Sequence, residues 1–129
     1  MISVTKIFMF EASHHLPHYE GACHNLHGHS YKLEVTVTGN IQVDSSNPKC
    51  GMIIDFKDLK EIVKETVIDK YDHSYLNDFF PNPTAEIMVL DIAREINKAL
   101  LEKDLDIQLE SCKLWETTTS YAEYRPIEM

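Results

Sequence analysis

The chain has 129 residues, of which 43% are hydrophobic and 26% charged, values typical of a globular domain. Its formal net charge of -9 argues against nucleic-acid and anionic-membrane partners, which bind through basic surfaces. No segment approaches the length of a membrane span, and the first residues lack a signal-peptide pattern. We therefore expect one domain over residues 1–129 that is soluble and cytoplasmic.

The first predicted strand ends at a histidine. Phe8, Phe10 and Ala12 recur at every second position, and His14 continues this inward-facing row because alternate residues of a strand share a face. His15 would then face the other way. A bulge near the end of the strand would reverse this choice.

A second strand is predicted over residues 30–38, and His27-Gly28-His29 stands at its beginning. Both imidazoles can converge on one ion, because residues two apart share a face, and Gly28 leaves room for close approach. An open catalytic zinc site usually has three protein ligands, so a third donor is needed. His14 is the best candidate. The set His14, His27 and His29 suits Zn²⁺, although other metals that prefer imidazole could also use it.

Clustering favours a metal site over chance, since six of the seven histidines fall between positions 14 and 29. Three of the six are expected to be surface or loop imidazoles: His15, His18 and His24. Cys23 is either a buried structural thiol or a base beside the metal. Three cysteines at irregular spacing do not suggest a disulfide framework, so Cys50 and Cys112 are expected to be plain structural or surface thiols.

Two helices are predicted after a polar loop at residues 40–49. Asp55 can cap the first, which should end near Lys70, and the second should begin at Thr84, directly after Pro83. Apolar residues at helical spacing give each helix a buried stripe. The stripes comprise Phe56, Leu59, Ile62, Val63 and Val67 in the first helix, and Val89, Ile92, Ala93, Ile96 and Leu100 in the second.

Two more strands complete the predicted fold. Asp104–Thr117 is the third, with a bulge expected near Ser111 where the alternation changes phase, and Ser120–Tyr124 is a short fourth. This order predicts an α+β fold, a four-stranded antiparallel sheet with two helices between strands 2 and 3 packed on one face. Its long edges need covering, and joining the strands of neighbouring subunits into a β-barrel is a natural solution.

Several motifs occur together, in order, along nearly the whole chain. They are Phe10-Glu11-Ala12-Ser13-His14, Cys23-x-x-x-His27-Gly28-His29, Gly51-Met52-Ile53-Ile54-Asp55-Phe56, Asp72-His73-x-x-Leu76-Asn77, Asn82-Pro83-Thr84-x-Glu86 and Glu116-Thr117. In this combination the chain resembles the 6-pyruvoyltetrahydropterin synthase and 6-carboxytetrahydropterin synthase family of tunnel-fold enzymes. Departures are small: Ser13 stands where alanine is common, and Tyr71 stands where leucine is usual.

The resemblance implies a zinc ion on the three histidines, with Cys23 as the base that abstracts a proton and Asp72 with His73 as its partner pair. A thiolate base needs a lowered pKa, and both a metal ion and a protonated His73 have the right charge to lower it. Without the resemblance, Asp72-His73 would more often be a surface pair in a loop.

Glu116 matches the acidic residue that anchors the pterin ring in this family and takes part in its catalytic charge relay. A carboxylate there can accept two parallel hydrogen bonds from an amidine-like edge. An ordinary exposed strand glutamate is the alternative reading. Thr84 is a further candidate for substrate binding, although helix capping explains it equally well.

The implied function is a zinc-dependent 6-carboxy-5,6,7,8-tetrahydropterin synthase. This carbon-carbon lyase would convert 7,8-dihydroneopterin triphosphate to 6-carboxytetrahydropterin, with release of acetaldehyde and triphosphate, on the way to queuosine and other deazapurines. One alternative is a 6-pyruvoyltetrahydropterin synthase, a phosphorus-oxygen lyase that eliminates triphosphate without cleaving the side chain. A zinc- or pterin-binding module without turnover is another. The intact Cys23 argues against the branch that replaces it with glutamate and serves folate synthesis. The resemblance also suggests a homo-oligomer, a hexamer of two stacked trimers with its sites where subunits meet.

Overall fold

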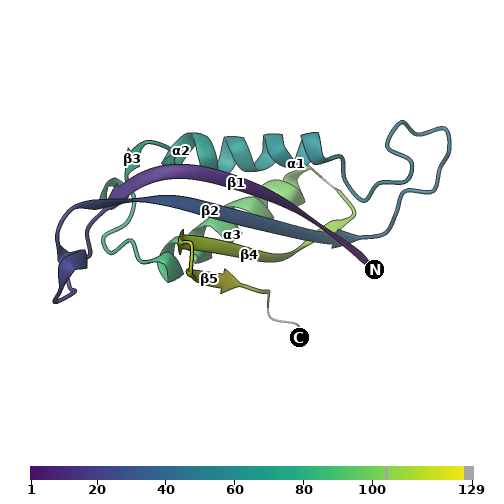
Figure 1. Cartoon of the computed structure of the whole chain (residues 1–129). Helices are drawn as coiled ribbons and strands as arrows, with labels where there is room; N and C mark the ends of the chain where they lie inside the picture. The colour runs from purple at the N-terminus through teal and green to yellow at the C-terminus, as the bar shows by residue number, and fades with distance from the viewer. Residues whose placement is uncertain (104, 127–129) are drawn as a thin grey trace.

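The computed structural model describes residues 1–103 and 105–126, which form one sheet covered by helices on one face (Figure 1). The strands are β1 (Ile2–His14), β2 (His27–Gly39), β3 (Ser74–Tyr75), β4 (Ile107–Thr117) and β5 (Ser120–Tyr124). The helical segments are η1 (Ala22–His24), α1 (Phe56–Val63), η2 (Lys64–Ile68), α2 (Asp69–Tyr71), η3 (Leu76–Asp78) and α3 (Ala85–Glu102). In the sheet the strands follow the order β3-β1-β2-β4-β5.

Strands β1 and β2 pair along their whole length, in an antiparallel register that runs from Ile2 opposite Gly39 to His14 opposite His27. The register is continuous, so the bulge that would have exchanged His14 for His15 does not occur. Phe10, Ala12 and His14 are buried. The predicted inward row of the first strand is therefore confirmed.

The first helical run begins and ends close to the predicted positions. The Asp55 side chain accepts a hydrogen bond from the backbone N–H of Lys57, and the run passes through the π-helical turn η2 to end at Tyr71. The predicted stripe is buried except for Phe56, which is 50% exposed. Placing Phe56 in the core was wrong, because the first residue of a helix has a neighbouring turn on one side only.

Helix α3 begins where the sequence predicts. The Thr84 side chain accepts a hydrogen bond from the backbone N–H of Ile87, which caps the helix, and the whole predicted stripe is buried. Met88 joins that stripe at 0% exposure. Helix α3 thereby seals the inner face of the sheet against β4 and β5 (Figure 1).

The third and fourth predicted strands are β4 and β5. The expected start at Asp104 lies outside the described residues, and β4 begins at Ile107. Thr36 pairs with Ser111 while Val37 pairs with Leu109, so Glu110 is the additional residue of a bulge. The bulge predicted near Ser111 is confirmed.

The sheet differs from the prediction by one short strand. Ser74 and Tyr75 form β3, which pairs in parallel with Ala12 and Ser13 at the outer edge of β1. The described residues therefore form a five-stranded mixed sheet rather than a four-stranded antiparallel one. A strand of two residues is too short to show alternation, so the sequence gives no signal for it.

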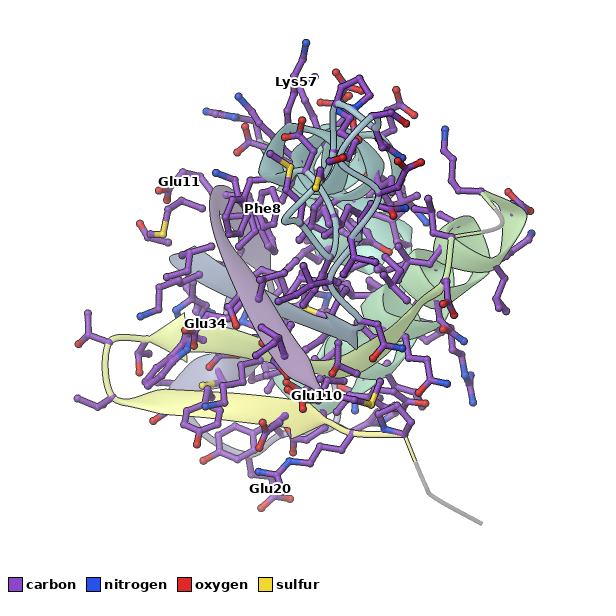
Figure 2. The ribbon with its side chains drawn as sticks, turned by 90° about the vertical axis from the view of Figure 1, so that its right-hand side faces the viewer. Phe8, Glu11, Glu20, Glu34, Lys57 and Glu110 are labelled. Atoms are coloured by element: carbon purple, nitrogen blue, oxygen red, sulfur yellow. The ribbon has the colours of Figure 1, made fainter. Side chains whose placement is uncertain are left out.

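The two faces of the sheet have different surroundings. Tyr31, Leu33 and Val35 of β2 are 0% exposed beneath the helices. Glu11 and Glu34 point away from the helices (Figure 2). Among residues 1–103 and 105–126 we find no helix that is both long and apolar enough to cross a membrane.

Candidate metal centre

Three histidines converge at the ends of the two longest strands. His14 is the last residue of β1, and His27 and His29 are the first and third residues of β2, so antiparallel pairing brings them to one place. The Nε2 atoms of His14 and His27 lie 3.1 Å apart. One ring nitrogen from each of the three side chains falls within 4.8 Å of the others.

The shortest of these separations, 3.1 Å between the Nε2 atoms of His14 and His27, fits a zinc ion. Zinc–nitrogen bonds of about 2.0–2.1 Å in a tetrahedron place neighbouring nitrogens about 3.3 Å apart. The Nε2 atom of His29 is buried and lacks a hydrogen-bond partner among the described residues. An orphaned buried polar atom is costly, and a metal ion would satisfy it. The donor set and its geometry are therefore compatible with zinc.

Backbone carbonyl groups orient two of the three rings. Nδ1 of His14 lies 2.9 Å from the carbonyl oxygen of Pro83, and Nδ1 of His27 lies 2.7 Å from that of Asn25. Each Nδ1–H can donate to its carbonyl, which leaves the lone pair on Nε2, the atom that faces the cluster. This outer-shell pattern is common around metal-binding histidines.

The cluster favours neutral imidazoles, the form that binds metal. Burial is the main cause that lowers the pKa of His14 and of His29 below 6.5, and the neighbouring histidines lower it further. The hydrogen bond to the Pro83 carbonyl opposes this shift in His14, and the Glu116 carboxylate opposes it in both rings. Because burial outweighs these contacts, the pKa of both rings stays below the usual histidine value.

Glu116 approaches the histidines from β4. Its carboxylate oxygens lie 3.9 Å from Nε2 of His14 and 3.7 Å from Nε2 of His29. The side chain is 27% exposed. The adjacent Trp115 points to the opposite face, where its indole N–H donates to Glu34 at 2.7 Å. Strand alternation thus turns Glu116 toward the histidines.

A pocket of 520 Å³ adjoins this carboxylate, between the start of α3 and the β4–β5 hairpin. Thr84 and Glu116 both line it, together with Leu16, Glu86, Ser120 and Tyr121. The pocket is large enough for a bicyclic ring. Thr84 also uses its hydroxyl oxygen to cap α3, at 3.2 Å from the backbone nitrogen of Ile87.

Cys23 lies in η1, within the connection between β1 and β2. Its carbonyl oxygen accepts a hydrogen bond from the backbone N–H of Leu16 at 2.8 Å, which folds the connection back on the end of β1. The thiol is free and half-buried. Of the other two cysteines, Cys50 is exposed and Cys112 is buried, as expected for surface and structural thiols.

Asp72 and His73 lie at the outer edge of β1. The Asp72 carboxylate accepts a hydrogen bond from the backbone N–H of Glu11 at 2.9 Å, and this is the main cause that lowers the pKa of Asp72. Nδ1 of His73 lies 3.1 Å from the same carboxylate, in a side chain that is 80% exposed. Across the described part of the chain, neither residue forms a hydrogen bond or ion pair with the three clustered histidines.

The remaining histidines lie away from the cluster. The ring of His15 stacks on Tyr75 with centroids 6.2 Å apart, while His18 and His24 are exposed. Sequence reasoning missed the Pro83 carbonyl, because a backbone contact leaves no trace in residue type. It also missed the hydrogen bonds between the Asn77 side chain and the backbone of His15, although Asn77 belongs to one of the motifs quoted above.

Comparison with known proteins gives one consistent result. The model of the family described as "6-pyruvoyl tetrahydropterin synthase" matches residues 3–127. A Haemophilus influenzae protein named 6-carboxy-5,6,7,8-tetrahydropterin synthase is 35% identical, over 97% of this chain and 99% of its own length. A Pyrococcus furiosus protein named dihydroneopterin monophosphate aldolase is 40% identical over 70% of each chain.

A solved structure supports the fold. The 6-pyruvoyl tetrahydropterin synthase of Caenorhabditis elegans superposes with a TM-score of 0.80, covering 98% of this chain and 96% of that one. At 23% identity, this likeness speaks for the fold alone. The α+β tunnel-type subunit predicted from the sequence is thereby confirmed.

Proposed function

Because the chain belongs to the 6-pyruvoyl tetrahydropterin synthase family, we propose that it is a zinc-dependent 6-carboxy-5,6,7,8-tetrahydropterin synthase. Its substrate would be 7,8-dihydroneopterin triphosphate, and its products 6-carboxytetrahydropterin, acetaldehyde and triphosphate. The observation that carries the proposal is the convergence of His14, His27 and His29 beside Glu116. The similarity to the Haemophilus protein over nearly both whole chains favours this reaction over the others of the family.

The three histidines would hold the zinc ion. When bound, the ion would supply a Lewis acid that favours negative charge on the side-chain oxygens of the substrate. Glu116 would accept two parallel hydrogen bonds from the amino group and ring nitrogen of the pterin, a charge-assisted and therefore selective arrangement. The pocket shared by Glu116 and Thr84 would receive the ring.

Cys23 would act as the base that removes a carbon-bound proton from the substrate side chain. Its connection is folded onto the end of β1 through the Leu16 contact, close in the chain to His14. The Asp72–His73 pair lies instead on the outer edge of β1 and is open to solvent. We therefore assign that pair to the site of a neighbouring subunit, where its imidazole would exchange protons with the substrate.

Such sharing requires an oligomer. The helix-free face and the edges of the sheet remain uncovered in one chain, with Ile7 and Met9 54% and 58% exposed, and joining sheets into a barrel would cover them. We propose a homo-oligomer, a hexamer of two stacked trimers, in the cytoplasm. The pathway would be that of queuosine and related deazapurines.

Product analysis tests the proposed reaction. The purified zinc-loaded protein is incubated with 7,8-dihydroneopterin triphosphate, the pterins are identified by mass spectrometry, and acetaldehyde is assayed in parallel. Carboxytetrahydropterin together with acetaldehyde is the expected result, and a His14→Ala variant serves as the inactive control.

Other products would identify the alternatives. A pyruvoyl pterin without acetaldehyde would show a 6-pyruvoyltetrahydropterin synthase. A parallel incubation with dihydroneopterin monophosphate addresses the activity named for the Pyrococcus relative. Tight pterin binding without turnover of either compound would identify the protein as a pterin-binding module.

A further inference from the structure

We propose that Asn77 is a positioning residue for the metal centre, because its carboxamide fixes the end of β1 and thereby the place of His14. This inference rests on the proposed zinc site and assigns Asn77 no contact with metal or substrate. The residue would act through the backbone of His15, which directly follows the metal ligand.

The contact has two hydrogen bonds. The backbone N–H of His15 donates to Oδ1 of Asn77 at 3.0 Å, and Nδ2 of Asn77 donates to the carbonyl oxygen of His15 at 3.0 Å. A carboxamide offers one acceptor and a donor group, as a peptide unit does. Asn77 therefore satisfies both backbone groups of His15 in the way a neighbouring strand would.

The segment from Asp72 to Asn77 holds β1 along its outer edge. At one end, the Asp72 carboxylate binds the backbone N–H of Glu11, and the N–H of His73 donates to the carbonyl of Glu11 at 2.6 Å. In the middle, β3 pairs with Ala12 and Ser13. At the other end, pairing of the two backbones stops, and the Asn77 side chain supplies the last contact.

Asn77 is itself well anchored. It belongs to the turn η3, whose first residue, Leu76, is 0% exposed in the core. On the opposite edge of β1, His14 pairs with His27. The end of β1 is thus held from both sides, and the His14 ring is directed to the Pro83 carbonyl and to the other two rings.

Without the carboxamide, two backbone groups of His15 lose their partners and the strand end can fray. The His14 nitrogen would then occupy its place beside His27 for only part of the time. Loss of an outer-shell contact typically weakens metal binding by about 10- to 100-fold. Since Asn77 acts through one intervening residue, we expect a value at the lower end of that range.

Zinc titration of the full chain tests the inference. Wild-type protein and Asn77→Ala are titrated against a competing chelator at 10 °C, with the folded state of both checked by circular dichroism, and Co²⁺ spectra record the ligand geometry. We expect the dissociation constant for zinc to rise by about tenfold in Asn77→Ala, with weakened Co²⁺ bands. Asn77→Asp keeps the acceptor but places a carboxylate oxygen against the carbonyl oxygen of His15, so it should not restore zinc affinity to the wild-type value.

Two controls separate positioning from general destabilisation. Asn47 makes a comparable contact within a remote loop, where its Oδ1 accepts from the backbone N–H of Lys49 at 2.8 Å, so Asn47→Ala should bind zinc normally. Ile92→Val weakens the core at a buried position in α3, a different element from β1. The inference would be overturned if Asn77→Ala bound zinc as tightly as wild type. It would also be overturned if Asn77→Ala lost no more zinc affinity than Ile92→Val does at the same loss of Tm. A wild-type chain that binds no zinc would contradict the proposed metal centre itself, and the inference with it.

Discussion

Nδ1 of His14 lies 2.9 Å from the carbonyl oxygen of Pro83, and this contact joins the end of β1 to the residue before the cap of α3. Pro83 is buried and Thr84 begins the helix turn, so the carbonyl has a fixed position. Because this carbonyl accepts from Nδ1–H, Nε2 of His14 keeps a free lone pair beside His27 and His29. The helix start thus selects the tautomer that a metal ion requires.

The first prediction separates His14 from its neighbour. His14→Ala removes a nitrogen from the cluster and should abolish stoichiometric zinc binding, whereas His15→Ala should retain it because the His15 ring stacks on Tyr75. Zinc content is measured by elemental analysis after dialysis against a weak chelator. Metal loss in His15→Ala alone would show that the wrong histidine has been assigned.

The second prediction concerns Cys23. Cys23→Ala should keep the full zinc content and lose turnover of the pterin triphosphate by at least about 100-fold, the lower contribution of a positioned base. Cys50→Ala, which removes an exposed thiol, is the matched control and should be fully active. Loss of metal from Cys23→Ala would make the thiol a ligand instead of a base.

The third prediction separates two roles of Thr84. Thr84→Ala should lower the free energy of unfolding by about 1 kcal/mol, because the N–H of Ile87 loses its cap. Thr84→Asp should restore this stability, since a carboxylate is an equally good cap. Urea unfolding measures both changes. If Thr84 also contacts the substrate, Thr84→Asp will recover the stability but keep a raised KM.

The fourth prediction is a pH dependence of stability. Burial raises the pKa of the Cys112 thiol to about 12 from an ordinary 9.0. The unfolded chain can then ionise this thiol from about pH 9, while the folded chain cannot. The contribution of Cys112 is fully present below pH 9 and is lost as the pH rises toward 12.

A comparison of wild type with Cys112→Val isolates this effect. The variant should lose less stability than wild type between pH 9 and pH 11 in urea unfolding. At pH 8, a thiol reagent should modify Cys50 rapidly and Cys112 only after unfolding. Rapid modification of Cys112 in the folded protein would contradict its burial.

Much of the fold could be predicted from local patterns. Strand alternation placed Phe10, Ala12 and His14 on one face, and the change of phase near Ser111 located the bulge. The residues Asp55 and Thr84 marked the helix starts through their capping oxygens. These features are governed by neighbours in the chain, so residue type and spacing are sufficient to find them.

In the candidate site, too, local patterns predicted some features, and contacts between distant segments set the others. The histidine spacing by itself indicated the cluster, because strand alternation put His14 at the end of one inward row and His27 and His29 on one face of the next strand. The antiparallel register of the structure brings His14 opposite His27. The position of Glu116, the short strand β3 and the contacts of Pro83 and Asn77 depend on segments far apart in the chain. Backbone carbonyl groups and a two-residue strand have no residue-type signature, and only tertiary packing decides which of them meet. The sequence therefore determined which groups can bind a metal ion, and the tertiary structure decided what orients them.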